Sequence, residues 1–193
     1  MVIFYRFRYH VFVASLLSLV FIFTFSSTAF ASVTAQSLFQ ISSDPYTNST
    51  SQHQTEVEPD SYSNGSTIVS ATQVGRFNDG GASNIGWATS TDNGATWHGG
   101  FLPNTTVYAT PAGTFDRVSD PSVTYDAAHK LWMISSLAIS NATGTPVGAA
   151  VIVNISTDGG LTWNAPVTIA NANSGFFDKD WICLLYTSPS PRD

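Results

Sequence analysis

Residues 90–97, with the sequence STDNGATW, recur as STDGGLTW at residues 156–163. Six of the eight positions are identical, in the pattern S-T-D-x-G-x-T-W. An acidic residue followed by proline precedes each copy, Glu58-Pro59 by 32 residues and Asp120-Pro121 by 36. Self-similarity at a period of this size is typical of repeat architectures, in which each repeat is one supersecondary unit. The sequence therefore predicts two equivalent structural units, one around each octapeptide.

Each octapeptide has the composition of a tight turn between two strands. Its aspartate can accept hydrogen bonds from backbone N–H groups within the turn. The glycine that both copies share, Gly94 or Gly160, supplies a positive φ. The tryptophan begins the next strand and buries a large ring. A metal-binding or catalytic aspartate is the alternative interpretation. The residues that we assign to this structural turn are Ser90, Asp92, Gly94, Thr96, Trp97, Ser156, Asp158, Gly160, Thr162 and Trp163.

The chain around the octapeptides alternates short apolar runs with turn residues. Residues 66–74, 131–139 and 149–155 are rich in β-branched and aromatic side chains, and Gly, Asn, Asp and Pro bound them. No stretch shows a sustained 3.6-residue period with helix caps. The sequence therefore predicts an all-β fold.

Composition limits the classes of function. Of the 193 residues, 43% are hydrophobic and only 10% are charged, with a formal net charge of −6. An average soluble protein has roughly 25% charged residues. A protein that binds nucleic acid would normally carry a basic patch, so we expect no nucleic acid as a partner.

The N-terminus has the features of a secretory signal peptide. Arg6 and Arg8 precede an apolar run at residues 11–25, and residues 29–31 (AFA) form a small-x-small cleavage site. A membrane anchor is the alternative, but the run is shorter than the ~20 residues that span a bilayer. We predict a signal peptide at residues 1–31, a secreted protein without stable membrane insertion after cleavage, and a polar leader at residues 32–54.

The C-terminal residues 183–193, CLLYTSPSPRD, resemble a translated sequencing adapter. A native tail rich in Pro and Ser is the alternative. The only cysteine, Cys183, lies in this stretch, so we expect no disulfide and no cysteine-based metal site in the native part. Residues 32–182 hold four basic and twelve acidic residues, a net charge of −8, which suits a secreted protein and disfavours binding to anionic surfaces.

The octapeptides resemble the Asp box, also called the bacterial neuraminidase repeat, of sialidases and related β-propellers. This resemblance implies four-stranded antiparallel blades, six in a complete ring, with the Asp box between the third and fourth strands. A partial propeller would then occupy residues 55–182. Blade one would span residues 55–102, a long connection 98–119, blade two 120–170, and blade three would begin at 176–182.

The resemblance also predicts the individual strands. We expect strands at residues 56–61, 66–74 and 82–91 and from 96 onwards in the first blade, and at 122–126, 131–140, 149–157 and 162–169 in the second. Two blades cannot close a ring, and closure removes the open edges of a propeller. We therefore expect the chain as given to be a fragment without enzymatic activity.

Antiparallel order separates the turns of a blade into two ends. The octapeptides should share one end with Asp126 and Lys130. The opposite end, where propeller enzymes keep their active sites, should hold the acid–Pro pairs and the turns between second and third strands. Glu56, Asp116, Lys179 and the aromatic residues Phe101, Tyr108 and Phe115 of the long connection should lie there too.

Candidate site residues follow from this placement. Glycoside hydrolysis usually needs two carboxyl groups that flank the scissile bond, and arginine can bind a substrate carboxylate through two hydrogen bonds. We predict catalytic roles for Glu58, Asp120 and Asp178, and substrate-binding roles for Arg76, Arg117, Asp79 and Asp180. Solvated loops or ion pairs between blades are the alternative interpretation of the same charges.

The histidines show no metal-ligand spacing, so we predict neither a metal nor a cofactor; calcium on the acidic loops would lack a recognisable loop signature. The resemblance implies exo-acting hydrolysis of a terminal sialic acid or a related sugar, with carbohydrate or a glycoconjugate as the partner. The Phe/Tyr-Arg-Ile-Pro motif of sialidases is absent from the sequence. A non-catalytic secreted propeller that binds glycan or protein, and a glucan-cleaving hydrolase with paired carboxylates, are therefore the alternatives.

Overall fold

The computed structural model describes residues 38–173 and 175–184, and the predicted signal peptide and most of the predicted adapter tail lie outside them. The described residues form strands and turns without any helix, so none of them belongs to a helix that could span a membrane. The strands are β1 (Glu56–Asn64), β2 (Thr67–Arg76), β3 (Ala82–Ser90), β4 (His98–Phe101), β5 (Arg117–Asp126), β6 (Leu131–Ser140), β7 (Val147–Ser156) and β8 (Val167–Asn171).

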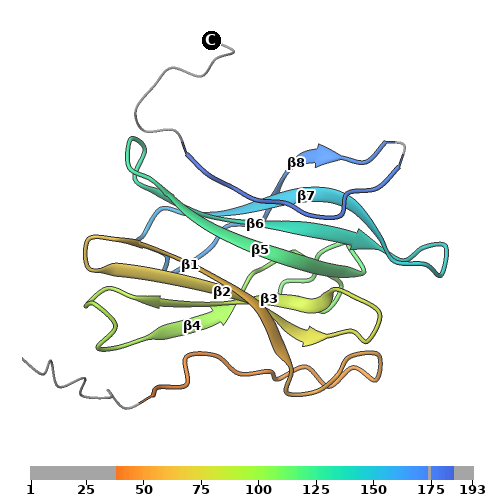
Figure 1. Cartoon of the computed structure of the whole chain (residues 1–193), viewed down its shortest axis with the longest axis horizontal. Helices are drawn as coiled ribbons and strands as arrows, with labels where there is room; N and C mark the ends of the chain where they lie inside the picture. Colours follow the sequence, from red (N-terminus) through yellow and green to blue (C-terminus); the bar gives the residue numbers. More distant parts are fainter. Residues whose placement is uncertain (1–37, 174, 185–193) are drawn as a thin grey trace, which may run out of the picture. The chain divides into compact units, whose positions relative to one another are not determined.

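Two antiparallel four-stranded units follow one another along the chain (Figure 1). We call β1–β4 the first blade and β5–β8 the second blade. Every strand pairs with its sequence neighbour within its own blade, whereas the two blades are joined by one β3–β5 pair, Ala82 with Val118. Strand β5 also packs against β1 and β2. The predicted all-β class is confirmed, and the arrangement is that of two neighbouring blades of a β-propeller.

Two strand starts differ by five residues from the expected ones, and the other starts differ by two residues or fewer. β5 begins at Arg117, five residues before the expected Ser122, because the strand passes through the Asp120-Pro121 pair as a bulge rather than starting after it. β8 begins only at Val167, whereas the expected start was Thr162. The equivalent turn network around Asp92 is followed by β4 already at His98, so the octapeptide network alone does not set this start. Pro166, which lacks an N–H group, directly precedes β8.

The two octapeptides form turns with the same hydrogen bonds, between β3 and β4 and between β7 and β8. In the first, Asp92 accepts from the Thr96 backbone N–H at 2.8 Å and from the Thr96 hydroxyl at 2.6 Å. Ser90 donates to Asp92 at 2.8 Å and accepts from the Gly94 N–H at 2.8 Å. These bonds stabilise the carboxylate, with the Thr96 hydroxyl as the largest cause, and lower the pKa of Asp92 to about 2.

The second octapeptide repeats this network on Asp158. Its carboxylate accepts from the Thr162 hydroxyl at 2.6 Å and the Thr162 N–H at 2.9 Å, and Ser156 donates to it at 2.8 Å. The hydroxyl of Thr162 is the largest cause that lowers the pKa of Asp158, again to about 2. The repeated sequence thus encodes a repeated local structure.

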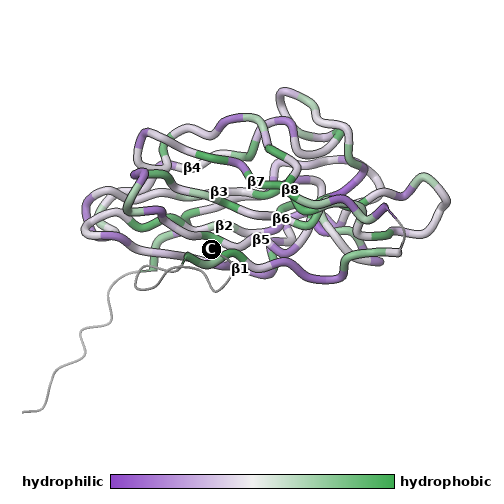
Figure 2. The backbone as a smooth tube through the Cα atoms, turned by 90° about the horizontal axis from the view of Figure 1, so that it is seen from above, coloured by the Kyte–Doolittle hydropathy of each residue, from purple (hydrophilic) through white to green (hydrophobic). Residues whose placement is uncertain are grey.

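The core lies between the two blades. Buried side chains from both contribute to it, among them Val69 and Ile85 of the first blade and Trp132 and Ile152 of the second. Burial of such side chains contributes roughly 1.5–3 kcal/mol each relative to exposure. Figure 2 shows hydrophobic stretches along parts of several strands, whereas β1 is largely polar. This packing fixes one blade against the other and so fixes the site that they share.

The described part of the predicted leader is attached to the first blade. The hydroxyl of Tyr46 accepts a hydrogen bond from Asn84 at 2.9 Å, and the Tyr46 ring packs edge-to-face on Phe101 with centroids 5.5 Å apart. Ser51 forms an isolated bridge with Phe77. A segment that the sequence shows as polar is therefore ordered by a few aromatic and hydrogen-bonding contacts.

Candidate functional site

The two acid–Pro pairs occupy equivalent bulges in the first strand of each blade. The β1–β2 register shifts between Val57 and Asp60, and the β5–β6 register shifts between Ser119 and Ser122. Glu58 and Asp120 have positive φ values of 53° and 50°. A bulge turns a side chain away from the regular alternation of a strand, which suits it to present functional groups.

A chain of hydrogen bonds links these two bulges. Gln73, on β2, donates to the carboxylate of Glu58 and, at 3.2 Å, to the hydroxyl of Ser119. Ser119 donates in turn to Asp120 at 2.7 Å. Two of the three predicted catalytic positions, Glu58 and Asp120, are therefore connected across the blade boundary. The buried Gln73 that connects them was not predicted from the sequence. Gln73 is one of several polar residues in β2, so the sequence offered no specific signal for it.

Lys179 completes this cluster from the C-terminal segment. Its Nζ lies 2.6 Å from Asp120 Oδ1, and the Asp120 side chain is 13% exposed. Burial lowers the pKa of Lys179, but the hydrogen bond to Asp120 and the charges of Asp120 and Glu58 outweigh it, and the pKa is raised. Lys179 thus stays cationic and neutralises Asp120.

Asp180 is buried beside this ion pair. Its Oδ2 accepts a hydrogen bond from the hydroxyl of Ser135 at 2.6 Å. Burial is the main cause that raises the pKa of Asp180 to about 6, and the negative charge of Asp120 raises it further. A carboxyl group that titrates near neutral pH is therefore present, but its side chain is enclosed by protein.

Arg117 and Asp79 form an ion pair between the start of β5 and the β2–β3 turn. Arg117 Nη1 and Nη2 lie 2.5 and 3.3 Å from the two oxygens of Asp79, and Nη1 also donates to the Gly80 carbonyl at 2.9 Å. The guanidinium lies 4.3 Å from the centre of the Phe77 ring. The hydrogen bond to Arg117 is the largest cause that lowers the pKa of Asp79. The arginine therefore acts here as a structural ion-pair partner.

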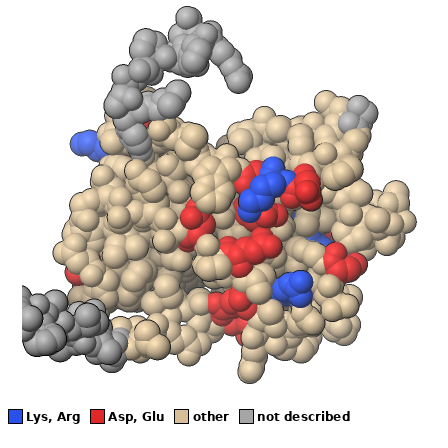
Figure 3. All heavy atoms as spheres, viewed as in Figure 1, with Lys and Arg blue, Asp and Glu red and all other residues tan. Residues whose placement is uncertain are grey.

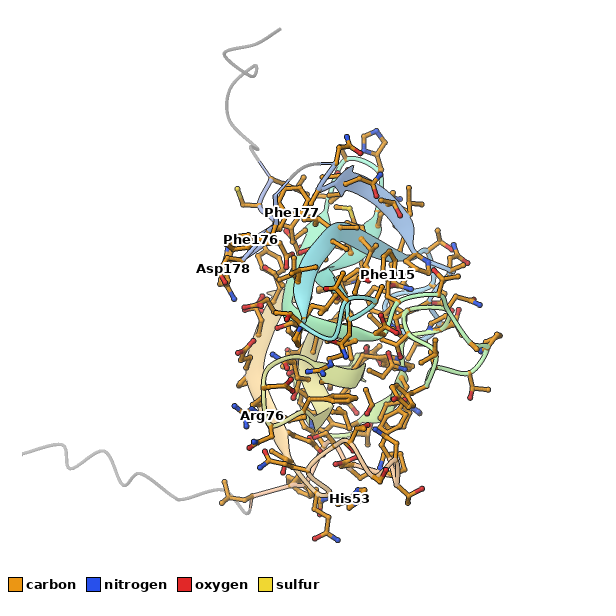
Figure 4. The ribbon with its side chains drawn as sticks, turned by 90° about the vertical axis from the view of Figure 1, so that its right-hand side faces the viewer. His53, Arg76, Phe115, Phe176, Phe177 and Asp178 are labelled. Carbon is orange, nitrogen blue, oxygen red and sulfur yellow. The ribbon has the colours of Figure 1, made fainter. Side chains whose placement is uncertain are left out.

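A pocket of about 340 Å³ opens beside these groups. Asp79, Asp120 and Asp178, three of the predicted site residues, contribute to its wall. Phe176 and Phe177 line it as well, and Figure 4 shows both beside Asp178. The remaining lining residues are Gly80, Gly81, Ser119, Leu137, Ile139, Pro146, Val147 and Gly148. The pocket thus combines carboxylates with apolar and aromatic surface.

The C-terminal segment that carries these aromatic rings is anchored to the second blade. Phe177 donates from its backbone N–H to the Gly148 carbonyl at 2.9 Å, and the Ile182 N–H contacts the hydroxyl of Ser122 at 3.4 Å. The aromatic pair directly before Asp178 was the sequence signal for these residues.

Other predicted residues lie away from the pocket. Arg76 donates to the side-chain oxygen of Gln52 at 3.0 Å, and Figure 4 shows it apart from the Phe176–Asp178 group. Glu56 accepts from Ser42 of the leader. The aromatic residues of the long connection do not line the pocket: Phe101 contacts Tyr46, Tyr108 contacts Phe77 and Phe115 packs against the core.

Backbone and side-chain contacts show which turns share an end of the blades. The Asn93 N–H of the first octapeptide donates to the Ser66 carbonyl in the β1–β2 turn at 2.9 Å. At the other end, Asp116 accepts from the Asn141 N–H in the β6–β7 turn at 2.6 Å. Acidic and basic side chains gather over the middle of one face in Figure 3. The described residues contain no group of three or more His, Cys, Asp or Glu placed to hold a metal ion.

No protein-family model matches the sequence, and no curated protein matches it either. Among solved structures, the chain is similar to the Hadza microbial sialidase Hz136, with a TM-score of 0.47 and 21% sequence identity. The match covers 59% of this chain and 26% of the sialidase. The chain thus spans about a quarter of the length of that sialidase.

Proposed function

We propose that the pocket beside Asp178 is a carbohydrate-binding site on a sialidase-like Asp-box propeller. The observation that carries this proposal is the meeting of three carboxylates with two phenyl rings around one pocket. Ligand pockets are typically apolar and aromatic, with a few polar groups that orient the ligand. Sugar hydroxyls donate to carboxylates, and the C–H faces of a sugar ring pack on aromatic side chains.

Binding by the full chain tests this proposal. We expect isothermal titration calorimetry to detect binding of lactose or cello-oligosaccharides. Asp178→Asn should weaken it by roughly tenfold, because a hydrogen bond to a charged group contributes about 1.5–3 kcal/mol. Arg76→Ala is the matched control, since Arg76 lies outside the pocket, and should bind normally. An absence of binding, or equal binding by the Asp178 variant, would refute the proposal.

Glycoside hydrolysis is the second candidate function, and the presence of Asp120 and Asp178 on one pocket wall favours it. Exo-acting cleavage of terminal sialic acid, which the resemblance implies, and cleavage of a glucan both belong to this candidate. Release of 4-methylumbelliferone from a fluorogenic glycoside, lost in Asp120→Asn, would favour hydrolysis instead.

We also propose that the protein is secreted, on the basis of the predicted signal peptide at residues 1–31. Expression in a secreting host followed by N-terminal sequencing tests this. The expected product in the medium begins at Ser32. Recovery of the uncleaved chain in the membrane fraction would favour the anchor.

A further inference from the structure

The charges around the pocket bear on which sugars it accepts. Its lining residues include three carboxylates, whereas no Lys, Arg or His occurs among them. Two cations, Arg117 and Lys179, form ion pairs with two of these carboxylates. We infer that the pocket selects neutral sugars over sugars that carry a carboxylate. This inference rests on the proposed carbohydrate-binding function and names its substrate class.

The first cation, Arg117, is not available to a ligand. Its side chain is only 8% exposed, and both terminal nitrogens bind Asp79. It also donates to the Gly80 carbonyl and stacks on Phe77. An incoming carboxylate would have to displace Asp79 from a two-point ion pair, which is the geometry that binds arginine most strongly.

The second cation, Lys179, is bound to Asp120 at 2.6 Å. Asp178 is exposed and has no hydrogen-bond or ion-pair partner within the described residues. The Asp79 side chain is 60% exposed despite its contact with Arg117. Asp178 therefore presents unshared carboxylate oxygens to a ligand, and these accept hydrogen bonds but do not donate them. Both oxygens of Asp79 already accept from Arg117.

A neutral sugar satisfies this surface, since each hydroxyl can donate to a carboxylate oxygen. A sialic or uronic acid would bring a further negative charge next to Asp178, whose charge is unpaired within the described part of the chain, whereas the charges of Asp79 and Asp120 are paired with Arg117 and Lys179. Like charges at short range repel one another. The preference for neutral sugars then has two causes: electrostatic repulsion weakens binding of the acidic sugar, and hydrogen bonds stabilise the bound neutral sugar.

Matched ligand pairs test this inference on the full chain. Methyl β-glucoside and methyl β-glucuronide differ by one carboxylate. Lactose and 3′-sialyllactose differ by the acidic sugar residue that extends lactose. We expect the neutral member of each pair to bind about tenfold more tightly at low ionic strength, with a smaller ratio at high salt. Asp178→Asn should bring the affinities for the neutral and acidic sugars closer together. Arg76→Ala should leave the ratio of these two affinities unchanged.

The outcomes separate the two proposals. Equal or tighter binding of the acidic member would overturn the inference while carbohydrate binding stands. A preference for the neutral sugar that persists unchanged in Asp178→Asn would also overturn it, because the carboxylate would then not be the cause. If neither member of any pair binds, carbohydrate binding itself is refuted, and the inference with it.

Discussion

Thr89, on β3 of the first blade, donates a 2.6 Å hydrogen bond from its hydroxyl to the carbonyl oxygen of Gly160 in the second octapeptide. A turn of one blade thus packs directly on a strand of its neighbour. Gly160 has φ of +85°, and a Cβ there would lie 2.8 Å from Val69 Cγ2 and 3.0 Å from Thr89 Oγ1. Glycine is therefore required at this position for backbone conformation and for contact between the blades.

Gly160→Ala should destabilise the chain more than Gly159→Ala. Both glycines have φ of +85°, but a Cβ at Gly159 meets nothing within 4 Å. The left-handed conformation costs about 1–2 kcal/mol in either variant, and overpacking at Gly160 adds about 1–3 kcal/mol. Urea unfolding measures the difference. Equal losses would show that the second octapeptide does not pack on the first blade.

Thr162→Val should raise the pKa of Asp158 from about 2, because it removes the hydroxyl that most stabilises the carboxylate. A depressed pKa stabilises the folded state above the ordinary value of 3.8, and that stabilisation is lost as the pH falls towards 2. The variant should thus be less stable at neutral pH and approach the parent chain near pH 2. Carboxyl NMR titration and acid unfolding measure both effects. Thr157→Val, at an exposed neighbouring threonine, is the control, and an unchanged Asp158 pKa in Thr162→Val would contradict this account.

Asp180→Asn should change the free energy of unfolding with a pH dependence opposite to that of Thr162→Val. The pKa of Asp180 is raised to about 6, so the folded state binds this proton more tightly than the unfolded state, and stability falls as the pH rises from about 4 to 6. Asparagine keeps an acceptor for Ser135 and cannot ionise. The variant should therefore gain stability relative to the parent above pH 6 and lose this advantage below pH 4. A difference in unfolding free energy that does not vary with pH would contradict the burial of this charge.

Arg117→Ala should destabilise the chain by about 2 kcal/mol, through loss of hydrogen bonds to Asp79 and Gly80 and of stacking on Phe77. Arg76→Ala, which removes a more exposed arginine with one hydrogen bond to Gln52, should change stability by less than about 0.5 kcal/mol. Thermal or urea unfolding distinguishes them. Similar small effects would mean that the Arg117–Asp79 pair is not structural.

The fold was predictable because its signals are local. The octapeptides specify their turns through residues four positions apart, such as Asp92 and Thr96, and antiparallel hairpins follow from turns between apolar runs. The start of β8 was not predicted, because the two octapeptides form the same turn network but are followed by strands at different distances, at His98 and at Val167.

The candidate site was predictable only in part. Antiparallel order brought Asp79, Asp120 and Asp178 to one region, and they do line one pocket. Their partners depend on tertiary contacts that no local pattern encodes. Gln73 reaches Ser119 across the blade boundary, and Arg117 is held by Asp79, 38 residues earlier in the chain.

Chemical-shift mapping of the full chain during titration with lactose tests the central claim most directly, namely that ligand binds at the pocket end of the blades. The account predicts saturable shifts at the backbone amides of Asp79, Asp120, Phe177 and Asp178. The amides of Asp92 and Asp158, in the octapeptides, should stay unchanged. Shifts centred on these two aspartates, with none around the pocket, would contradict the account.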